Sequence, residues 1–301
     1  MNENWSKYVQ GINTLYSSRK LRFDDMFSEQ FINAFHIDRE KKVRILEIGC
    51  GPGALAGALH RWYPNAEITG LDLDTAFIRF AKENEKGVTF LEGDAQKLPF
   101  EDESFDVTIS NTVSEHIPPE AFFGEQMRVL KKGGICLVLS ARKGYRQKSQ
   151  FEKKTEFEDK FWERVLQFDD SMERFSVGKY GMNEQSLPKT MEEYGFQSVS
   201  TAYAVSNLTP DNEGIPKEMA VSMINASRYN DLDAIQSVLE TMPERVTKEE
   251  IEEMTRLANR KYDLRIQKYL AGEKEWDTTV SIAMIVRGVK RSDSAIKRAV
   301  G

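Results

Sequence analysis

The chain has 301 residues, of which 40% are hydrophobic and 30% are charged, which is the composition of an ordinary soluble globular protein. This length accommodates one large domain with insertions or two smaller domains. The net charge of -6 argues against nucleic-acid binding as the dominant role of the surface, because phosphate binding needs clustered Lys and Arg.

The start of the chain, MNENWSKYVQ, lacks the apolar core of a signal peptide, and no apolar run approaches membrane-spanning length. We therefore expect a cytoplasmic protein with no membrane partner. Cys50 and Cys136 fall in or beside predicted core strands. Two isolated cysteines make neither a disulfide framework nor a metal site, so no metal is predicted.

Residues 1–36 predict two amphipathic helices, because large apolar side chains recur at helical spacing. The first helix carries Trp5, Tyr8, Ile12, Leu15 and Tyr16, and the second carries Phe23, Met26, Phe27, Phe31 and Phe35. The simplest interpretation is that both helices pack against the rest of the domain.

The most informative stretch is VRILEIGCGPGA, residues 43–54. Its apolar, β-branched start predicts a buried strand, and the glycines Gly49, Gly51 and Gly53 follow before a helix predicted at residues 55–63. The free amides of that helix face the turn, as in a nucleotide-binding site. The Gly49-x-Gly51-x-x-Ala54 spacing is compatible with a dinucleotide fingerprint. Glu47 argues against it, because a carboxylate there repels phosphate but suits a ligand with an ammonium group.

Acidic residues also follow the next two predicted strands. The strand at residues 66–73 ends in GLDLD, and Asp72 lies about 20 residues beyond the glycine turn, where a carboxylate can accept both hydroxyls of a ribose. Asp74 is expected to cap a helix at residues 75–84. The strand at residues 88–91 is followed by Asp94. A turn or capping role for Asp94 is the alternative on local chemistry alone.

The Glu47-x-Gly49-x-Gly51-x-Gly53 pattern with these strand ends resembles the class I S-adenosylmethionine-dependent methyltransferases. The resemblance implies that Asp94 bonds the adenine amino group and that the Ala95 amide meets a ring nitrogen. It also places Leu73 and Asn111, at the second and fourth strand ends, in the cofactor site. Asn111-Thr112-Val113-Ser114 differs from the Asn-Pro-Pro-Tyr of enzymes that methylate amino groups of nucleic acids and glutamine, which disfavours that substrate class.

Candidate substrate residues lie after the fourth strand and in the N-terminal helices. Glu115 and His116 stand where the nucleophile of the substrate is expected, and a histidine that titrates near neutrality could remove its proton. A structural role for His116 is the alternative. In the resembling family, N-terminal helices often close over the cofactor. The lid candidates are therefore Tyr8, Tyr16, Arg19 and Arg22, with an arginine able to pair with the cofactor carboxylate.

The second half of the chain departs from the family pattern. A fifth strand is expected up to Ser140 after a Gly133-Gly134 turn, and a basic run at residues 142–154 leads into an amphipathic helix. That run is either a solvated face or a site for an anionic substrate. Strands are predicted at residues 196–208 and 278–286, and the segment between them predicts helices at 217–228, 232–241 and 248–270. The last of these helices opens with the capping box Thr247-x-x-Glu250.

We therefore predict an α/β Rossmann-like class I methyltransferase sandwich. It has a mostly parallel seven-stranded sheet with helices on both faces, N-terminal helices, and a helical insertion before the last strand. The expected parts are a cap at 1–40, a core at 41–209, an insertion at 210–274 and a last strand with tail at 275–301.

The expected function is methyl transfer from S-adenosyl-L-methionine to a small molecule, with S-adenosyl-L-homocysteine as product. Two alternatives stay open, a catalytically silent cofactor-binding module and, less favoured, a nicotinamide-dependent oxidoreductase. The N-terminal helices and the insertion are predicted to form a mobile lid that excludes water. The acceptor and the oligomeric state are not predicted.

Overall fold

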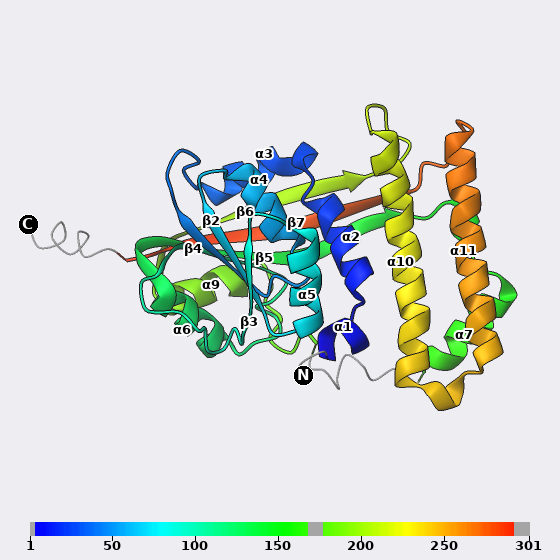
Figure 1. The fold of residues 1–301 in the computed structure, drawn as a ribbon, viewed down its shortest axis with the longest axis horizontal. Coiled ribbons are helices and arrows are strands. Elements are labelled where there is room, and N and C mark those ends of the chain that lie inside the picture. The colour runs from blue at the N-terminus through cyan, green and yellow to red at the C-terminus, as the bar shows by residue number, and fades with distance from the viewer. Residues whose placement is uncertain (1–3, 168–176, 292–301) are drawn as a thin grey trace, which may run out of the picture.

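A twisted seven-stranded sheet organises the protein, seen in a computed structural model that describes residues 4–167 and 177–291 (Figure 1). The strand order is β3-β2-β1-β4-β5-β7-β6. The first five of these run parallel, and β7 is antiparallel to both β5 and β6. The strands are β1 (Arg44–Ile48), β2 (Glu67–Asp72), β3 (Thr89–Glu92), β4 (Phe105–Asn111), β5 (Leu130–Gln147), β6 (Phe196–Leu208) and β7 (Thr278–Lys290).

Helices cover both faces of the sheet, because each strand alternates apolar side chains between two separate cores. One core lies under α3 (Ser28–Phe35), α4 (Ala54–Trp62) and α5 (Thr75–Asn84). The other lies under α6 (Pro119–Val129) and α9 (Ser186–Glu193). The sandwich expected from the sequence is confirmed.

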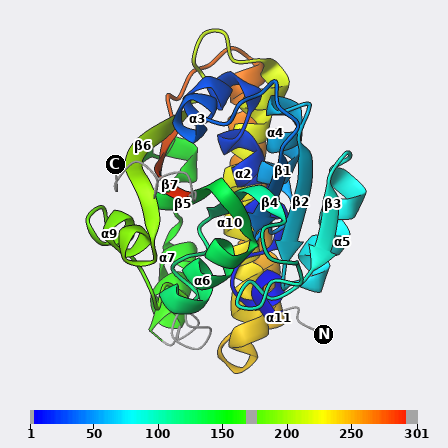
Figure 2. The ribbon, with the colours of Figure 1, turned by 90° about the vertical axis from the view of Figure 1, so that its left-hand side faces the viewer.

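A third core lies beyond the sheet, between α7 (Glu156–Leu166), α10 (Lys217–Thr241) and α11 (Lys248–Leu270). It is built from Phe161, Val165, Ile235, Val238, Met242, Ile251, Met254 and Ala258. The long helices α10 and α11 stand side by side at one end of the molecule, and α1 (Asn4–Tyr8) and α2 (Ile12–Arg22) lie between α10 and the sheet (Figures 1 and 2). Helix α7 therefore packs with the helices of the insertion, although it precedes β6 in the chain.

Local sequence signals predicted several elements to within a residue or two. Asp74 caps α5 by accepting from the amides of Ala76 and Phe77. Thr247 and Glu250 form the expected capping box at the start of α11. Strands β6 and β7 pair along their whole length, so the two ends of the insertion meet as predicted.

The N-terminal prediction of two helices needs correction. The first is broken between Tyr8 and Ile12, where Gly11 opens α2, and a short 3₁₀ turn, Asp25–Phe27, precedes α3. A Cβ atom on Gly11 would lie 2.1 Å from a carboxylate oxygen of Asp233 on α10. The break therefore lets the bare backbone approach α10.

Two more elements differ from the sequence prediction. The helices expected at 217–228 and 232–241 are one continuous helix, α10. The Gly133-Gly134 turn and the start of the basic run both lie within β5, which continues to Gln147. Short 3₁₀ turns, Gln150–Glu152 and Pro243–Arg245, complete the assignment. Of the tail expected after the last strand, Lys290 still belongs to β7, and residues 292–301 lie outside the described residues.

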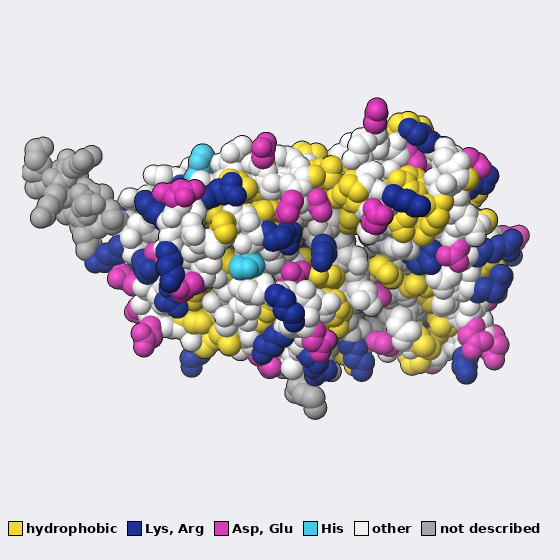
Figure 3. Space-filling view, turned by 45° about the horizontal axis from the view of Figure 1, so that its top comes forward, with side chains coloured by type: hydrophobic (Ala, Val, Ile, Leu, Met, Phe, Trp, Pro, Cys, Tyr) yellow, Lys and Arg dark blue, Asp and Glu magenta, His cyan; other side chains and the backbone are white. Residues whose placement is uncertain are grey.

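Charged side chains of both signs are interspersed over the face shown in Figure 3. Among the residues that the structure describes, none of the helices combines the length and apolar character needed to cross a membrane.

Candidate active site

The glycine loop joins β1 to α4 at the carboxyl edge of the sheet. Gly49, Gly51 and Gly53 all have positive φ angles, of 67°, 54° and 90°. The amides of Gly49 and Cys50 donate to the Leu71 carbonyl oxygen of β2, at 2.7 and 3.0 Å. These bonds fix the loop, so the bare backbone of Gly49 and Gly51 faces a cavity.

The cavity has a volume of about 980 Å³, near the top of the range for small-molecule pockets. Four groups of elements line it: the carboxyl ends of β1 to β5, the helices α1 and α2, the end of α7, and the second half of α10. Open parallel sheets bind ligands at this edge.

Asp72 and Asp94 both line the cavity at successive strand ends. Asp72 accepts hydrogen bonds from the amides of Gly51 and Asp74, at 2.8 and 2.9 Å. Burial nevertheless raises the pKa of Asp72 to about 6. Asp94 is exposed and accepts from the Gln96 amide at 2.8 Å.

Leu73 and Ala95 also line this part of the cavity. Leu73 is 46% exposed, so its side chain leaves an apolar surface for a flat ligand. The predicted residues of the second and third strand ends therefore come together on one wall.

Glu47 lies behind the glycine loop rather than on the cavity surface. Its side chain is fully buried, and neither carboxylate oxygen has a hydrogen-bond partner of good geometry among the described residues. Burial raises the pKa of Glu47 to about 8, and the charge of Arg19 and the Ala56 amide offset only part of this effect.

Arg19 of α2 reaches the end of β4, where its guanidinium donates to the Thr112 hydroxyl. Thr112 has a φ of 56°, a strained value for a β-branched residue. Burial lowers the pKa of Arg19, whereas the charges of Glu47, Asp72 and Glu115 raise it. Arg19 is thus the cation that balances the strand-end carboxylates.

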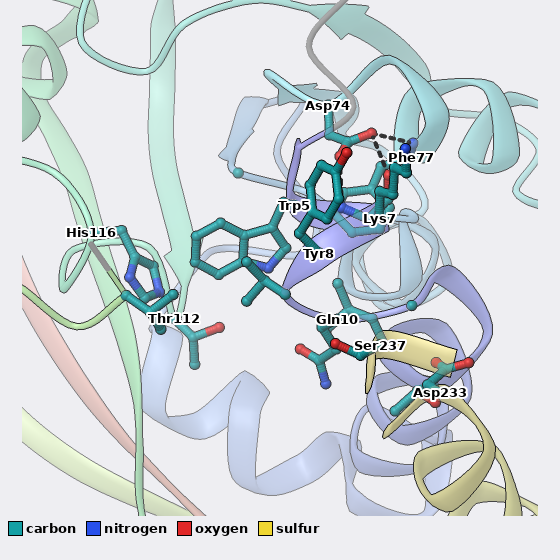
Figure 4. Close-up of a pocket in the computed structure, with 18 of the residues that line it drawn as sticks. Trp5, Lys7, Tyr8, Gln10, Asp74, Phe77, Thr112, His116, Asp233 and Ser237 are labelled. Carbon is teal, nitrogen blue, oxygen red and sulfur yellow. Dashed lines mark hydrogen bonds between the residues drawn. The ribbon is translucent and has the colours of Figure 1, made fainter. Parts of the chain in front are cut away.

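Helix α1 closes one side of the cavity by joining two strand ends (Figure 4). The Trp5 ring packs edge-on against His116, with centroids 4.6 Å apart. The Ser6 amide and hydroxyl both donate to Asp74, at 2.8 and 3.1 Å. Tyr8 also lines the cavity. Helix α1 thus lies beside the cavity, and closure of the N-terminal helices over a cofactor stays a prediction.

His116 lines the cavity, but its hydrogen bonding does not suit a general base. The Gly178 amide donates to its Nδ1 at 3.0 Å, so the neutral ring carries its proton on Nε2. Burial lowers the pKa of His116, which favours this neutral form. The free side of the ring therefore presents a donor.

Some predicted site residues lie off the cavity. Tyr16 turns toward α5 and donates to Glu85 at 2.8 Å. Glu115 accepts from the neighbouring Ser114 hydroxyl, and neither Glu115 nor Asn111 belongs to the lining. Gly53 caps α4 beneath Phe90. Arg22 does line the cavity, whereas the basic run at 142–154 contributes none of its basic side chains.

Sequence reasoning predicted that the insertion covers the site but named no residue of α10. Asp233 and Ser237, one helical turn apart, stand opposite α1 together with Gln10 (Figure 4). Trp5 and Ser6 were also missed as contacts of His116 and Asp74. No local signal marks residues 230–241, because polar side chains recur on the solvent face of any amphipathic helix.

This glycine loop, with carboxylates at the following strand ends, defines a Rossmann-like nucleotide-binding fold. Residues 46–138 match the family model described as a methyltransferase domain. This region is therefore similar to methyltransferase domains, and it contains the glycine loop, Asp72 and Asp94.

Two curated relatives match part of this chain. A fatty-acid O-methyltransferase of Mycolicibacterium smegmatis is 43% identical over 106 residues, which is 34% of this chain and 38% of that protein. The phthiotriol/phenolphthiotriol dimycocerosates methyltransferase 1 of Mycobacterium ulcerans is 42% identical over 112 residues, or 36% and 41% of the two chains. The matches thus span about two fifths of these relatives.

A solved structure is similar over most of this chain. Phosphoethanolamine N-methyltransferase 2 of Haemonchus contortus, in complex with S-adenosyl-L-methionine, aligns with a TM-score of 0.51 at 17% identity. The alignment covers 96% of this chain and 60% of that one. At 17% identity, this similarity shows a shared fold and nothing about the substrate.

Proposed function

We propose that the protein transfers the methyl group of S-adenosyl-L-methionine to a small-molecule acceptor. The observation that carries the proposal is the cavity wall, where Asp72, Leu73 and Asp94 stand beside the bare backbone of Gly49 and Gly51. This wall lies within the region that matches the methyltransferase family. Its carboxylates suit hydroxyl and amino groups better than a pyrophosphate, which disfavours a nicotinamide cofactor.

The residues present fit this cofactor. A Cβ atom on Gly49 would lie 2.4 Å from Val113, so only glycine leaves the backbone open there. We assign Asp72 to the ribose hydroxyls, Asp94 and the Ala95 amide to the adenine edge, and Leu73 to the adenine face. Arg19 is assigned to the cofactor carboxylate, since it already reaches the end of β4.

When bound, the cofactor supplies an electrophilic methyl group for direct displacement. The chain then has to align the acceptor and exclude water. Trp5 and Ser6 support this role, because their contacts to His116 and Asp74 hold α1 across the cavity. His116 is assigned to orient the acceptor by donating from Nε2, rather than to remove its proton.

The names of the two curated relatives refer to a fatty acid and to dimycocerosates, but the family model matches residues 46–138 and so excludes α7 and α10, which complete the cavity here. We therefore propose a small-molecule acceptor without adopting those substrates. The cytoplasmic location and the absence of a nucleic-acid partner stay predictions.

Labelled methyl transfer tests the function directly. Purified protein is incubated with S-adenosyl-L-methionine carrying a labelled methyl group and a metabolite mixture, and the labelled product is isolated. We expect one labelled small molecule, which the Asp72→Ala variant forms far more slowly. Cofactor binding without any labelled product would instead favour the silent binding module.

A further inference from the structure

Arg22 lies on the cavity wall and has no anionic partner among the residues that the structure describes. Its side chain is partly buried, and its Nε atom is fully buried with no hydrogen-bond partner among the described residues. Burial and the nearby charge of Arg19 lower the pKa of Arg22 to about 10, so the guanidinium stays charged at neutral pH. An uncompensated buried charge is unfavourable, and a bound anion would relieve that cost.

The neighbouring arginine, Arg19, differs from Arg22 because it has polar and charged partners. Arg19, one helical turn earlier on α2, donates to Thr112 and interacts with the charges of Glu47 and Asp72. None of these carboxylates contributes to the pKa of Arg22. The strand-end acids therefore compensate one arginine and leave the other available.

Helix α2 crosses the carboxyl edge of the sheet from one side to the other. Near its start, Tyr16 donates to Glu85 beside α5, and the middle of the helix reaches β4 through Arg19. At its end, the Arg22 carbonyl accepts from the Ser206 hydroxyl of β6, at 3.1 Å. Arg22 thus lies on the side of β4 away from β2 and β3.

That position separates Arg22 from the adenosine part of the proposed cofactor site. The adenine and ribose assignments use Asp72 and Asp94, at the ends of β2 and β3. On the opposite side, Ala141 at β5 lines the cavity. This half of the cavity is where an acceptor can approach the methyl group.

We propose that Arg22 binds an anionic group of the acceptor, a carboxylate or a phosphate monoester. This rests on the proposed methyltransferase function and narrows its substrate class to anionic small molecules. A guanidinium suits both groups, because its fork donates two parallel hydrogen bonds to either.

The test compares anionic and neutral probes of similar shape. Benzoate, phenyl phosphate and benzamide are titrated by calorimetry into wild-type protein, both free and saturated with S-adenosyl-L-homocysteine. The same titrations use Arg22→Gln, Arg22→Lys and the control Lys20→Gln. Lys20 lies on the same helix but is exposed outside the cavity, so its removal changes the net charge equally.

We expect wild type and Lys20→Gln to bind at least one anionic probe roughly tenfold more tightly than benzamide, as a charge-assisted contact would give. Arg22→Gln should lose the preference for anionic probes, and Arg22→Lys should keep part of it. In both variants the affinity for S-adenosyl-L-homocysteine should stay within about twofold of wild type. Equal binding of the three probes by wild type would overturn the proposal. So would a loss of S-adenosyl-L-homocysteine affinity in Arg22→Gln, which would assign this arginine to the cofactor carboxylate. If the wild-type protein binds no S-adenosyl-L-homocysteine, the proposed methyltransferase function itself fails, whatever the probes show for Arg22.

Discussion

Glu47 is a buried carboxyl group whose two oxygens have no hydrogen-bond partner of good geometry among the described residues. Its pKa of about 8 in the folded chain exceeds the value near 4.3 of an unfolded chain. A raised pKa means that the folded state binds more protons than the unfolded state across that interval. Stability should therefore fall as pH rises from about 4.3 to about 8.

Glu47→Gln removes this titration while keeping the shape of the side chain. Between pH 6 and pH 8 the free energy of unfolding of wild type should fall relative to the variant, by up to about 1.4 kcal/mol per pH unit. Urea unfolding at several pH values measures the difference. Asp72, with a pKa of about 6, titrates mainly below this window and in both proteins. Parallel profiles for the two proteins would show that Glu47 is ionised throughout.

Asp72 is the residue on which the cofactor assignment depends most. Asp72→Ala removes a contact to two ribose hydroxyls and also frees the Gly51 amide. We expect it to weaken S-adenosyl-L-homocysteine binding by roughly 1.5 to 3 kcal/mol, measured by calorimetry. Glu67→Ala, at the far end of the same strand, is the matched control and should bind like wild type. Asp94→Ala should weaken binding as well. Normal binding by folded Asp72→Ala and Asp94→Ala would show that the strand-end placement is wrong.

The hydrogen bond from Gly178 to His116 makes a prediction about proton position. Nitrogen NMR of the histidine rings should show His116 neutral with its proton on Nε2 between pH 7 and pH 8. A neutral ring with its proton on Nδ1 would leave Nε2 free to accept a proton and would restore the general-base interpretation, whereas a protonated ring at pH 7.5 would contradict the neutral form.

At the scale of elements, one buried ion cluster closes the insertion. Arg265 of α11 donates to Asp277 and Asp211, both at 2.8 Å, and its side chain is 1% exposed. Asp211 also accepts from the amides of Glu275 and Trp276. These bonds tie the two ends of the insertion together beside the start of β7.

Removing Arg265 should leave two carboxylates buried without their cation. We expect Arg265→Leu to destabilise the protein by about 3 to 5 kcal/mol in urea unfolding. The control is Arg256→Leu on the same helix, whose partner Glu253 is exposed and whose loss should cost less than about 1 kcal/mol. Equal, small effects of the two substitutions would mean that the cluster does not hold the insertion.

Elements with strong local signals could be predicted from the sequence. The glycines after β1, the capping residues Asp74 and Thr247, and the alternation of β6 each act over a few neighbouring residues. The break before α2 could not be predicted in this way, because it depends on a contact between Gly11 and Asp233 on α10.

The same reasoning explains the partial prediction of the site. Strand ends meet at one edge by topology, so Asp72 and Asp94 could be placed from the order of elements alone. Side-chain direction could not, and Tyr16 accordingly faces Glu85 instead of the cavity. The lining residues of α10 were not named, because they meet the cavity only through long-range packing against α2.

At the scale of the whole molecule, α1, α2 and α10 together cover the cavity. We expect them to act as a mobile lid. Hydrogen exchange should show increased protection in the N-terminal helices and in residues 211–272 when S-adenosyl-L-homocysteine and substrate bind. Protection confined to the glycine loop and strand ends would indicate that the insertion serves stability or assembly.

The central claim is that the cavity at the carboxyl edge of the sheet binds S-adenosyl-L-methionine. Calorimetric titration of the wild-type protein with S-adenosyl-L-homocysteine, and separately with NAD, tests it most directly. We predict binding of S-adenosyl-L-homocysteine and none of NAD, because the strand ends beside the glycine loop present the carboxylates of Asp72 and Asp94, which repel a pyrophosphate. Tight NAD binding, or no S-adenosyl-L-homocysteine binding by folded protein, would contradict the assignment.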